Sequence, residues 1–199
     1  GKSGFEASVN KDRWWEYNIV DFFPKLIPDD ISASIGIAQL RKLDRFNEIR
    51  RKHARIYSEA LGFLEEEGLI RLPREYGDVC GSWSLYEVLI NNAELRVGRD
   101  IIYNALRAEG APATIAYPRV LYENPLFKEL RGHGKGCPWR CPLNKYYTAP
   151  KFREGLTPIA ENVARRCLTL HTDPIMGEDG VKLVAKAFIK ILKYYQHTK

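Results

Sequence analysis

Apolar residues recur at intervals of three and four over residues 31–61, and charged residues fill most positions between them. This spacing is typical of an amphipathic helix that packs one face on a core. Asp29 or Asp30 stands just before the first apolar position and predicts the N-cap. Gly62 follows Leu61 and predicts the end. One long helix is therefore expected from the acidic cap to about Leu61.

Shorter elements follow in alternation. β-Branched and aromatic residues indicate the strands, and spacings of three and four indicate the helices. The predicted elements are strands at 69–72 and 82–90, a helix at 99–109, a strand at 113–117, a helix at 157–166, a strand at 168–171 and a closing helix at 178–195. Such an order predicts a layered fold of mixed helix and sheet, of the α/β or α+β class.

Two stretches lack this periodicity. Residues 1–28 are rich in aromatics and hold Pro24 and Pro28, which predicts an extended or looping segment. Residues 118–156 are rich in Pro, Gly, Arg and Tyr. A long irregular stretch inside a compact domain is usually functional or disordered, and the aromatics here favour a docked loop.

Composition narrows the class of protein. With 199 residues and 45% hydrophobic content, the chain can bury a sizeable core. No signal peptide or membrane span is evident, so a cytoplasmic location is expected by default. The four cysteines are too sparse for a disulfide scaffold and are expected to be reduced. The net charge of +6 is dispersed along the chain, which argues against nucleic-acid binding and favours a solvated surface.

Several stretches, taken in order, resemble one enzyme family. They are residues 15–21, the capped segment 29–44, Ile115-Ala116-Tyr117-Pro118 with residues 124–127, residues 136–142, and the closing segment 167–176. This order and spacing is similar to that of the DegT/DnrJ/EryC1/StrS aminotransferases, pyridoxal-phosphate enzymes that aminate keto-sugars and cyclitols. The first two stretches lie just past the middle of those enzymes, so the chain looks like their C-terminal half.

The resemblance implies a fold and a division into domains. The fold class is α/β, with an α+β small domain: the C-terminal part of the type I pyridoxal-phosphate aminotransferase fold. Residues 1–28 would end the large cofactor-binding domain, residues 29–61 would form a bridging helix, and residues 62–199 would form the small C-terminal αβ domain. The family's dimers share active sites, so a homodimer is expected, with the aromatic-rich residues 13–28 near the subunit contact.

The resemblance also implies the chemistry. Glutamate or glutamine would donate an amino group through pyridoxal phosphate to a keto-sugar, nucleotide-sugar or cyclitol. The lysine that binds the cofactor, the acid at its ring nitrogen and the group that stacks on its ring are expected upstream of Gly1. No catalytic residue is therefore expected within the chain, and the chain alone is expected to be inactive.

Three residues are candidates for binding. Lys25 would contact the cofactor phosphate across a dimer interface. Tyr117 and Arg119 would line the sugar pocket, where the Arg119 guanidinium offers a fork to a phosphate or carboxylate. Alternatively, Lys25 and Arg119 are solvated surface residues and Tyr117 is an aromatic at the end of a strand.

Departures from the family pattern leave a second interpretation open. Ile27 occupies the position where a neighbouring subunit's Asn or Arg reaches the cofactor phosphate, and Ala116 replaces the usual His. The chain could instead be a degenerate or split small domain, without catalysis, that serves in assembly or regulation.

Histidine and cysteine positions complete the candidates. His133, Cys137 and Cys141 have a spacing that could suit zinc, but no fourth ligand is evident and a rigid proline-rich loop explains the segment better. No metal site is predicted. His171 lies in an apolar strand and is expected to be a core histidine rather than a catalytic acid.

Overall fold

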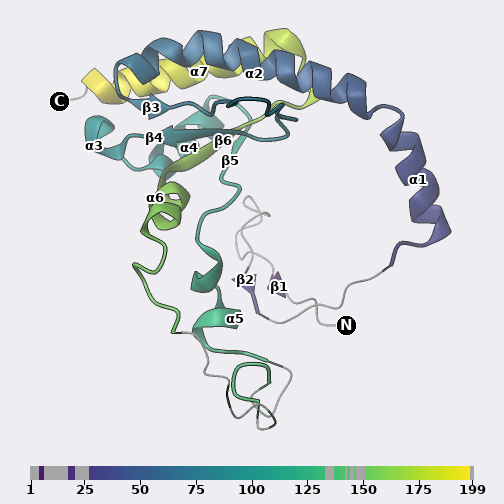
Figure 1. Cartoon of the computed structure of the whole chain (residues 1–199). Helices are drawn as coiled ribbons and strands as arrows, with labels where there is room; N and C mark the ends of the chain where they lie inside the picture. Colours follow the sequence, from purple (N-terminus) through teal and green to yellow (C-terminus); the bar gives the residue numbers. More distant parts are fainter. Residues whose placement is uncertain are drawn as a thin grey trace. The chain divides into compact units, whose positions relative to one another are not determined.

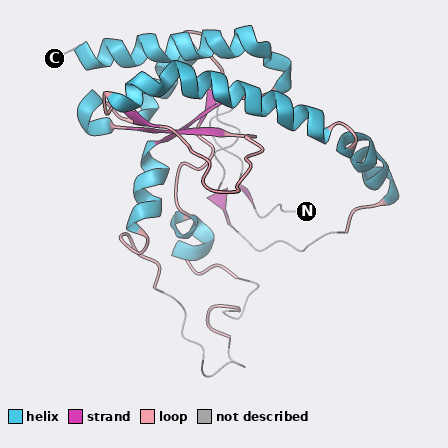
Figure 2. Ribbon diagram, turned by 45° about the horizontal axis from the view of Figure 1, so that its top comes forward, coloured by secondary structure: helices cyan, strands magenta, loops and turns pink. Residues whose placement is uncertain are grey.

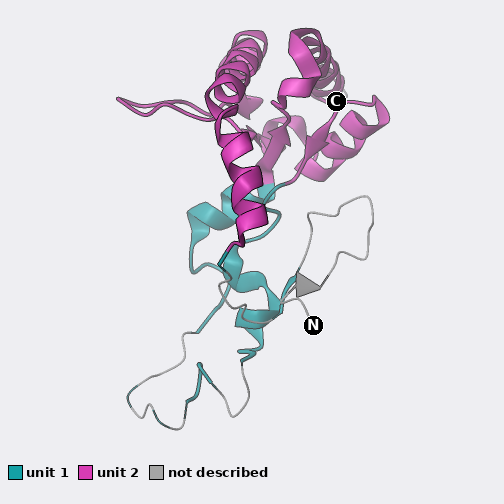
Figure 3. Ribbon diagram, turned by 90° about the vertical axis from the view of Figure 1, so that its right-hand side faces the viewer, with its two compact units in different colours: residues 1–27, 116–165 teal, residues 28–115, 166–199 magenta. Residues whose placement is uncertain are grey.

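The computed structural model describes residues 5–6, 18–20, 27–132, 137–141, 143, 146 and 151–197. The chain divides into two compact units (Figure 3). Unit 1 consists of residues 1–27 and 116–165, and unit 2 of residues 28–115 and 166–199. The mixture of helix and sheet confirms the predicted fold class. The three-part division into residues 1–28, 29–61 and 62–199 stays a prediction.

Unit 2 is built on a four-stranded antiparallel sheet in the order β3-β4-β6-β5. The strands are β3 (Ile70–Arg71), β4 (Tyr86–Ile90), β5 (Ala113–Thr114) and β6 (Cys167–Leu170). In the central pair, Tyr86 lies opposite Leu170 and Val88 opposite Leu168. Side chains alternate between the faces of a strand, so Tyr86, Val88 and Ile90 share one face, and all three are fully buried.

Two long helices, α2 (Leu43–Glu66) and α7 (Gly177–His197), run side by side over the sheet (Figures 1 and 2). Each buries one stripe of side chains at helical spacing: His53, Ala54, Tyr57, Leu61 and Leu64 from α2, and Val181, Val184, Ala185, Phe188, Ile191 and Leu192 from α7. The core of unit 2 lies between these stripes and the apolar face of the sheet. The short α3 (Asn92–Leu95) and α4 (Arg99–Ala108) also pack against α7.

The predicted helix over residues 31–61 is wrong in its continuity and its end. The structure has a separate helix α1 (Asp30–Leu40), and a turn at Arg41 and Lys42 separates it from α2. The cap is confirmed, because the Asp29 side chain accepts a hydrogen bond from Ser32 N at 2.7 Å. Helix α2 continues through Gly62, since burial of the residues on either side outweighs the weak helix propensity of glycine.

Other boundaries shift less. Helix α4 ends just before Gly110, whose φ of +75° suits glycine, as predicted. The strand expected at 113–117 is only two residues long, so Tyr117 lies in the loop beyond it. The strand expected at 82–90 begins at Tyr86, after Trp83, whose φ of +52° is incompatible with a strand.

Unit 1 holds the short antiparallel pair β1 (Phe5–Glu6) and β2 (Asn18–Ile19), the single turn η2 (Leu121–Glu123), α5 (Pro125–Lys128) and most of α6 (Pro158–Arg166). A small core of Val120, Tyr122 and Ala164 packs against Phe127 and Phe152. The Phe127 and Phe152 rings meet edge to face, with centroids 5.3 Å apart. The expectation of a docked loop over 118–156 is confirmed for these described residues.

A short 3-10 turn, η3 (Pro174–Met176), joins β6 to α7 in unit 2. Within the described part of the chain, no helix is both long and apolar enough to cross a membrane.

Candidate functional site

The loop after β5 carries two of the three predicted binding residues. Tyr117 is 70% exposed, and its ring is therefore available to a ligand. Arg119 is half-buried, and its Nη1 donates a hydrogen bond to Asn18 Oδ1 at 2.8 Å. A guanidinium has five N–H donors, so this bond sets the direction of the Arg119 side chain and leaves most of its donors for another partner.

The buried side chain of Asn124 holds the same two segments together. Its Oδ1 accepts a hydrogen bond from Ile19 N at 3.1 Å, and its Nδ2 donates to Leu121 O at 2.9 Å. Asn124 also precedes Pro125, the first residue of α5. Asn124 therefore connects strand β2 to the turn η2, although the two are about a hundred residues apart in sequence.

A buried carboxylate on α6 also forms hydrogen bonds with η2. Glu161 accepts hydrogen bonds from the Tyr122 hydroxyl and from Gly155 N, the latter at 2.9 Å. The hydrogen bond from Tyr122, followed by those from Thr157 N and Gly155 N, holds the pKa of Glu161 below its usual range. The network joins η2 to the start of α6.

The sequence analysis missed Asn18, Asn124 and Glu161 as parts of this arrangement. An asparagine directly before a proline and a glutamate in the first turn of a helix were signals for Asn124 and Glu161, since such residues satisfy free backbone groups. Asn18 carries no such signal, because its contact with Arg119 spans 101 residues.

The remaining candidates have different outcomes. Lys25 and His133 lie outside the described residues. Cys137 and Cys141 lie close enough for a thiol hydrogen bond, which raises the pKa of Cys137. Among the described residues no group of three potential metal ligands is close enough to hold an ion. His171, expected in the core, is only half-buried, with Nδ1 3.3 Å from Asp173 Oδ2.

The core histidine of unit 2 is instead His53, whose Nδ1 lies 3.0 Å from Thr172 O. His53 lies on α2 in register with the buried apolar residues, so its helical spacing places it in the core. His171 differs because it comes just after β6 ends, where the chain leaves the sheet.

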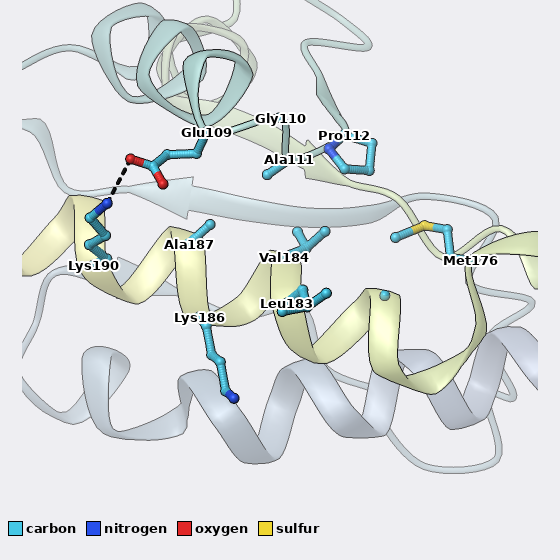
Figure 4. Close-up of a pocket in the computed structure, with 11 residues that line it drawn as sticks. Glu109, Gly110, Ala111, Pro112, Met176, Leu183, Val184, Lys186, Ala187 and Lys190 are labelled. Atoms are coloured by element: carbon cyan, nitrogen blue, oxygen red, sulfur yellow. Dashed lines mark hydrogen bonds and ion pairs between the residues drawn. The ribbon is translucent and has the colours of Figure 1, made fainter.

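Unit 2 contains a cavity of about 580 Å³, whose lining can be compared with the groups that pyridoxal phosphate needs (Figure 4). Lys186 and Lys190 of α7 line it, and Lys190 Nζ lies 2.8 Å from Glu109 Oε1. The cofactor needs a lysine, an acid at the ring nitrogen and a group over the ring. The described lining is largely apolar and has no aromatic ring, and its acid is paired with the lysine. This cavity does not fit the cofactor.

The sequence pattern of the DegT/DnrJ/EryC1/StrS aminotransferase family matches residues 4–139. The match covers β2, helices α1 and α2, the sheet up to β5 and the loop with Tyr117 and Arg119. The chain belongs to this family of aminotransferases.

Two curated relatives show how much of the family's length the chain spans. It is 26% identical to a dTDP-4-dehydro-2,3,6-trideoxy-D-glucose 4-aminotransferase of Saccharopolyspora spinosa, over 97% of this chain and 42% of the relative. It is 30% identical to an L-glutamine:2-deoxy-scyllo-inosose aminotransferase of Streptomyces lividus, over 83% of this chain and 38% of the relative. The chain thus spans less than half the length of these relatives.

A solved structure supports the fold. The aminotransferase PseC of Helicobacter pylori superposes with a TM-score of 0.63 at 16% identity, over 96% of this chain and 43% of PseC. At this identity the likeness supports the fold alone.

Proposed function

We propose that the chain is the C-terminal part of a pyridoxal-phosphate aminotransferase that moves an amino group from glutamate or glutamine to a keto-sugar or cyclitol. The observation that carries this proposal is the family match over residues 4–139. The names of the two curated relatives support the substrate class, because one acts on a keto-sugar nucleotide and the other on a cyclitol ketone.

Most of the cofactor site would lie outside this chain. When bound, pyridoxal phosphate supplies the electron sink that allows the amino group to be exchanged. The cavity beside α7 does not offer the lysine, acid and ring partner that this cofactor needs. Lys25 would add a contact to the cofactor phosphate.

The contribution of this chain would be recognition of the substrate. The loop presents the exposed ring of Tyr117 and the guanidinium of Arg119, whose direction is set by its hydrogen bond to Asn18. A guanidinium can bind a phosphate or a carboxylate through two parallel hydrogen bonds. Its fixed direction reduces the conformational entropy lost when an anionic substrate binds.

The intact protein would be a cytoplasmic homodimer in which residues 29–61 bridge a large and a small domain. Helix α1 supports this organisation, because its apolar side chains are exposed within the described structure. A helix with large apolar side chains on more than one side is normally buried in a larger body.

The alternative is a small domain without catalysis that serves in assembly or regulation. The observation that favours it is the residue at position 27, an isoleucine that is 91% exposed and offers no donor for a cofactor phosphate. The two functions differ in one measurable property, which is turnover by the intact gene product.

The experiment is to supply the intact gene product with glutamate or glutamine and a panel of nucleotide keto-sugars and cyclitol ketones. Mass spectrometry would detect the aminated product. Amination of one substrate supports the enzyme. No amination across the panel, by a protein that also takes up no pyridoxal phosphate, would favour the non-catalytic module.

Two variants of the active enzyme would test the substrate loop. Arg119→Ala should raise KM for a phosphate-bearing or carboxylate-bearing keto substrate, since loss of a charged hydrogen bond costs about 1.5–3 kcal/mol. The half-reaction with the amino donor should be spared. Asn18→Ala removes the tether but keeps the charge, so its effect on KM should be smaller. Equal damage to both half-reactions would argue against a role in substrate binding.

A further inference from the structure

Unit 2 contains a second pocket, of about 410 Å³, between α2 and the segment of residues 72–85 that joins β3 to β4. Three arginines line it: Arg51 and Arg55 from α2, and Arg74 from the segment. Trp83 forms part of its wall, and Glu75 is the acidic residue of the lining. We refer to it as the arginine pocket. Its volume falls in the range of small-molecule sites.

The positive charges of the arginine pocket are only partly compensated. Arg74 pairs with Glu65, with Nη2 2.8 Å from Oε2. Arg51 Nε donates to the carbonyl oxygen of Gly81 at 3.1 Å, a neutral partner. Arg55 forms no hydrogen bond or ion pair with the described residues. Arg51 and Arg55 are four residues apart on one helix face, where like charges repel each other. An anion between them would relieve this repulsion.

Glu75 does not serve as that anion. Its Oε1 accepts hydrogen bonds from Gly81 N and from Trp83 Nε1, the latter at 3.0 Å. The carboxylate therefore joins Glu75 to Gly81 and Trp83 within the same segment. Gly81 leaves room for these contacts, because a Cβ at this position would lie 2.8 Å from both the Trp83 ring and Glu75 Oε1 and would force a side chain to shift. The wall of the pocket is thus formed before any ligand binds.

Trp83 is held in an unusual conformation. Its φ is +52°, a left-handed value that is rare for a large side chain. The Thr172 hydroxyl donates to its carbonyl oxygen, and its ring lies against Tyr86 with centroids 5.7 Å apart. Strain that the surrounding contacts maintain is common at binding sites.

We propose that the arginine pocket binds the phosphate or diphosphate group of a small molecule. Arg55 and Arg51 would contact the phosphate oxygens from one turn of α2, and Arg74 would add charge from the opposite wall. Guanidinium groups suit this ligand because their N–H donors match the spacing of phosphate oxygens. The site lies wholly in unit 2. The lining of this pocket supports the proposal, which does not depend on the proposed transamination.

The test is titration of the 199-residue chain with inorganic pyrophosphate and, separately, with ADP, followed by calorimetry. Saturable binding of one equivalent is expected. Arg55→Ala should weaken it about 10-fold or more, since a charge-assisted contact is lost. Arg55→Lys, which keeps the charge without the fork, should be intermediate. Tighter binding of ADP would identify a nucleotide as the ligand, and equal binding would identify the diphosphate group itself.

A matched variant controls for general attraction of anions to a basic protein. Lys182→Ala removes one exposed positive charge of α7. It should bind pyrophosphate as the unaltered chain does. Circular dichroism melting would confirm that Arg55→Ala is folded. No saturable binding, or equal weakening by Lys182→Ala and Arg55→Ala, would overturn the proposal.

Discussion

Helices α1 and α2 follow one another in the chain and are covered very differently. Helix α2 is amphipathic and buries a stripe that includes Tyr57, Leu61 and Leu64, each at 0% exposure. Helix α1 has no buried residue within the described structure, and Ile31, Ile35, Ile37 and Leu40 are all more than half exposed. Ile31 and Ile35 are four residues apart and share one side of α1, whereas Ile37 and Leu40 are three residues apart and share another.

The two helices differ in how far the described structure covers their apolar side chains. The apolar stripe of α2 meets α7 and the sheet within unit 2. The apolar side chains of α1 lack such a cover within the described structure, although exposure of apolar groups to water is unfavourable. Helix α1 has no Lys or Arg, and the space beside Gly36 is open within the described structure, so a packing partner could approach there. We expect the intact protein to supply the missing cover.

The largest expected effect is on the free energy of unfolding of the 199-residue chain, where a core substitution is compared with one on the exposed helix α1. Phe188→Ala should lower the free energy of unfolding by about 3–5 kcal/mol, because it leaves a cavity where a fully buried ring packs. Ile35→Ala should change it by less than about 0.5 kcal/mol, because Ile35 is exposed. Urea unfolding followed by circular dichroism would measure both. A comparable loss for Ile35→Ala would show that α1 is already buried.

The second effect requires the intact protein. If α1 is covered there, Ile35→Asp buries a carboxylate without a partner and should destabilise the assembly by about 3 kcal/mol. Sedimentation velocity would show dissociation of the homodimer or loss of the folded protein. The same substitution in the 199-residue chain is the control and should leave its unfolding unchanged. An intact protein that tolerates Ile35→Asp would contradict a buried α1.

The smallest effect concerns the start of α1. The backbone N–H of Ser32, then its hydroxyl, holds the pKa of Asp29 below its usual value. A lowered pKa in the folded state means that the cap stabilises α1 above the unfolded pKa of about 3.9. That stabilisation is lost as the pH falls through the lower folded value.

Helix content of the chain should therefore decrease slightly below about pH 3.9. Asp29→Asn retains an oxygen acceptor without a titrating charge and should remove this component of the pH dependence. Amide exchange at α1, measured against α2 as an internal reference, would follow the change. An unaltered profile in Asp29→Asn would show that the cap does not couple to pH.

Sequence patterns anticipated most of unit 2. The stripes of α2 and α7 and the termination at Gly110 follow from helical spacing and from glycine's access to positive φ. The turn at Arg41 and Lys42 carries no glycine or proline, so local signals did not reveal it. The hidden signal was the switch from apolar residues on two sides of α1 to a one-sided apolar stripe in α2.

The candidate site was anticipated only in part. Tyr117 and Arg119 were identified through the family resemblance, and the structure brings both into the loop after β5. The bond from Arg119 to Asn18 was not predictable, because no local rule pairs residues 101 positions apart. The roles of Lys25, Tyr117 and Arg119 stay predictions.

The most direct test of the central claim is to locate the cofactor. Borohydride would reduce the adduct between pyridoxal phosphate and the intact gene product, and peptide mass spectrometry would identify the modified lysine. The account predicts an adduct on one lysine outside residues 1–199, and no adduct in the 199-residue chain treated alone. A single modified lysine within residues 1–199, with the absorbance of bound cofactor, would contradict the assignment of this chain as the part without the catalytic lysine.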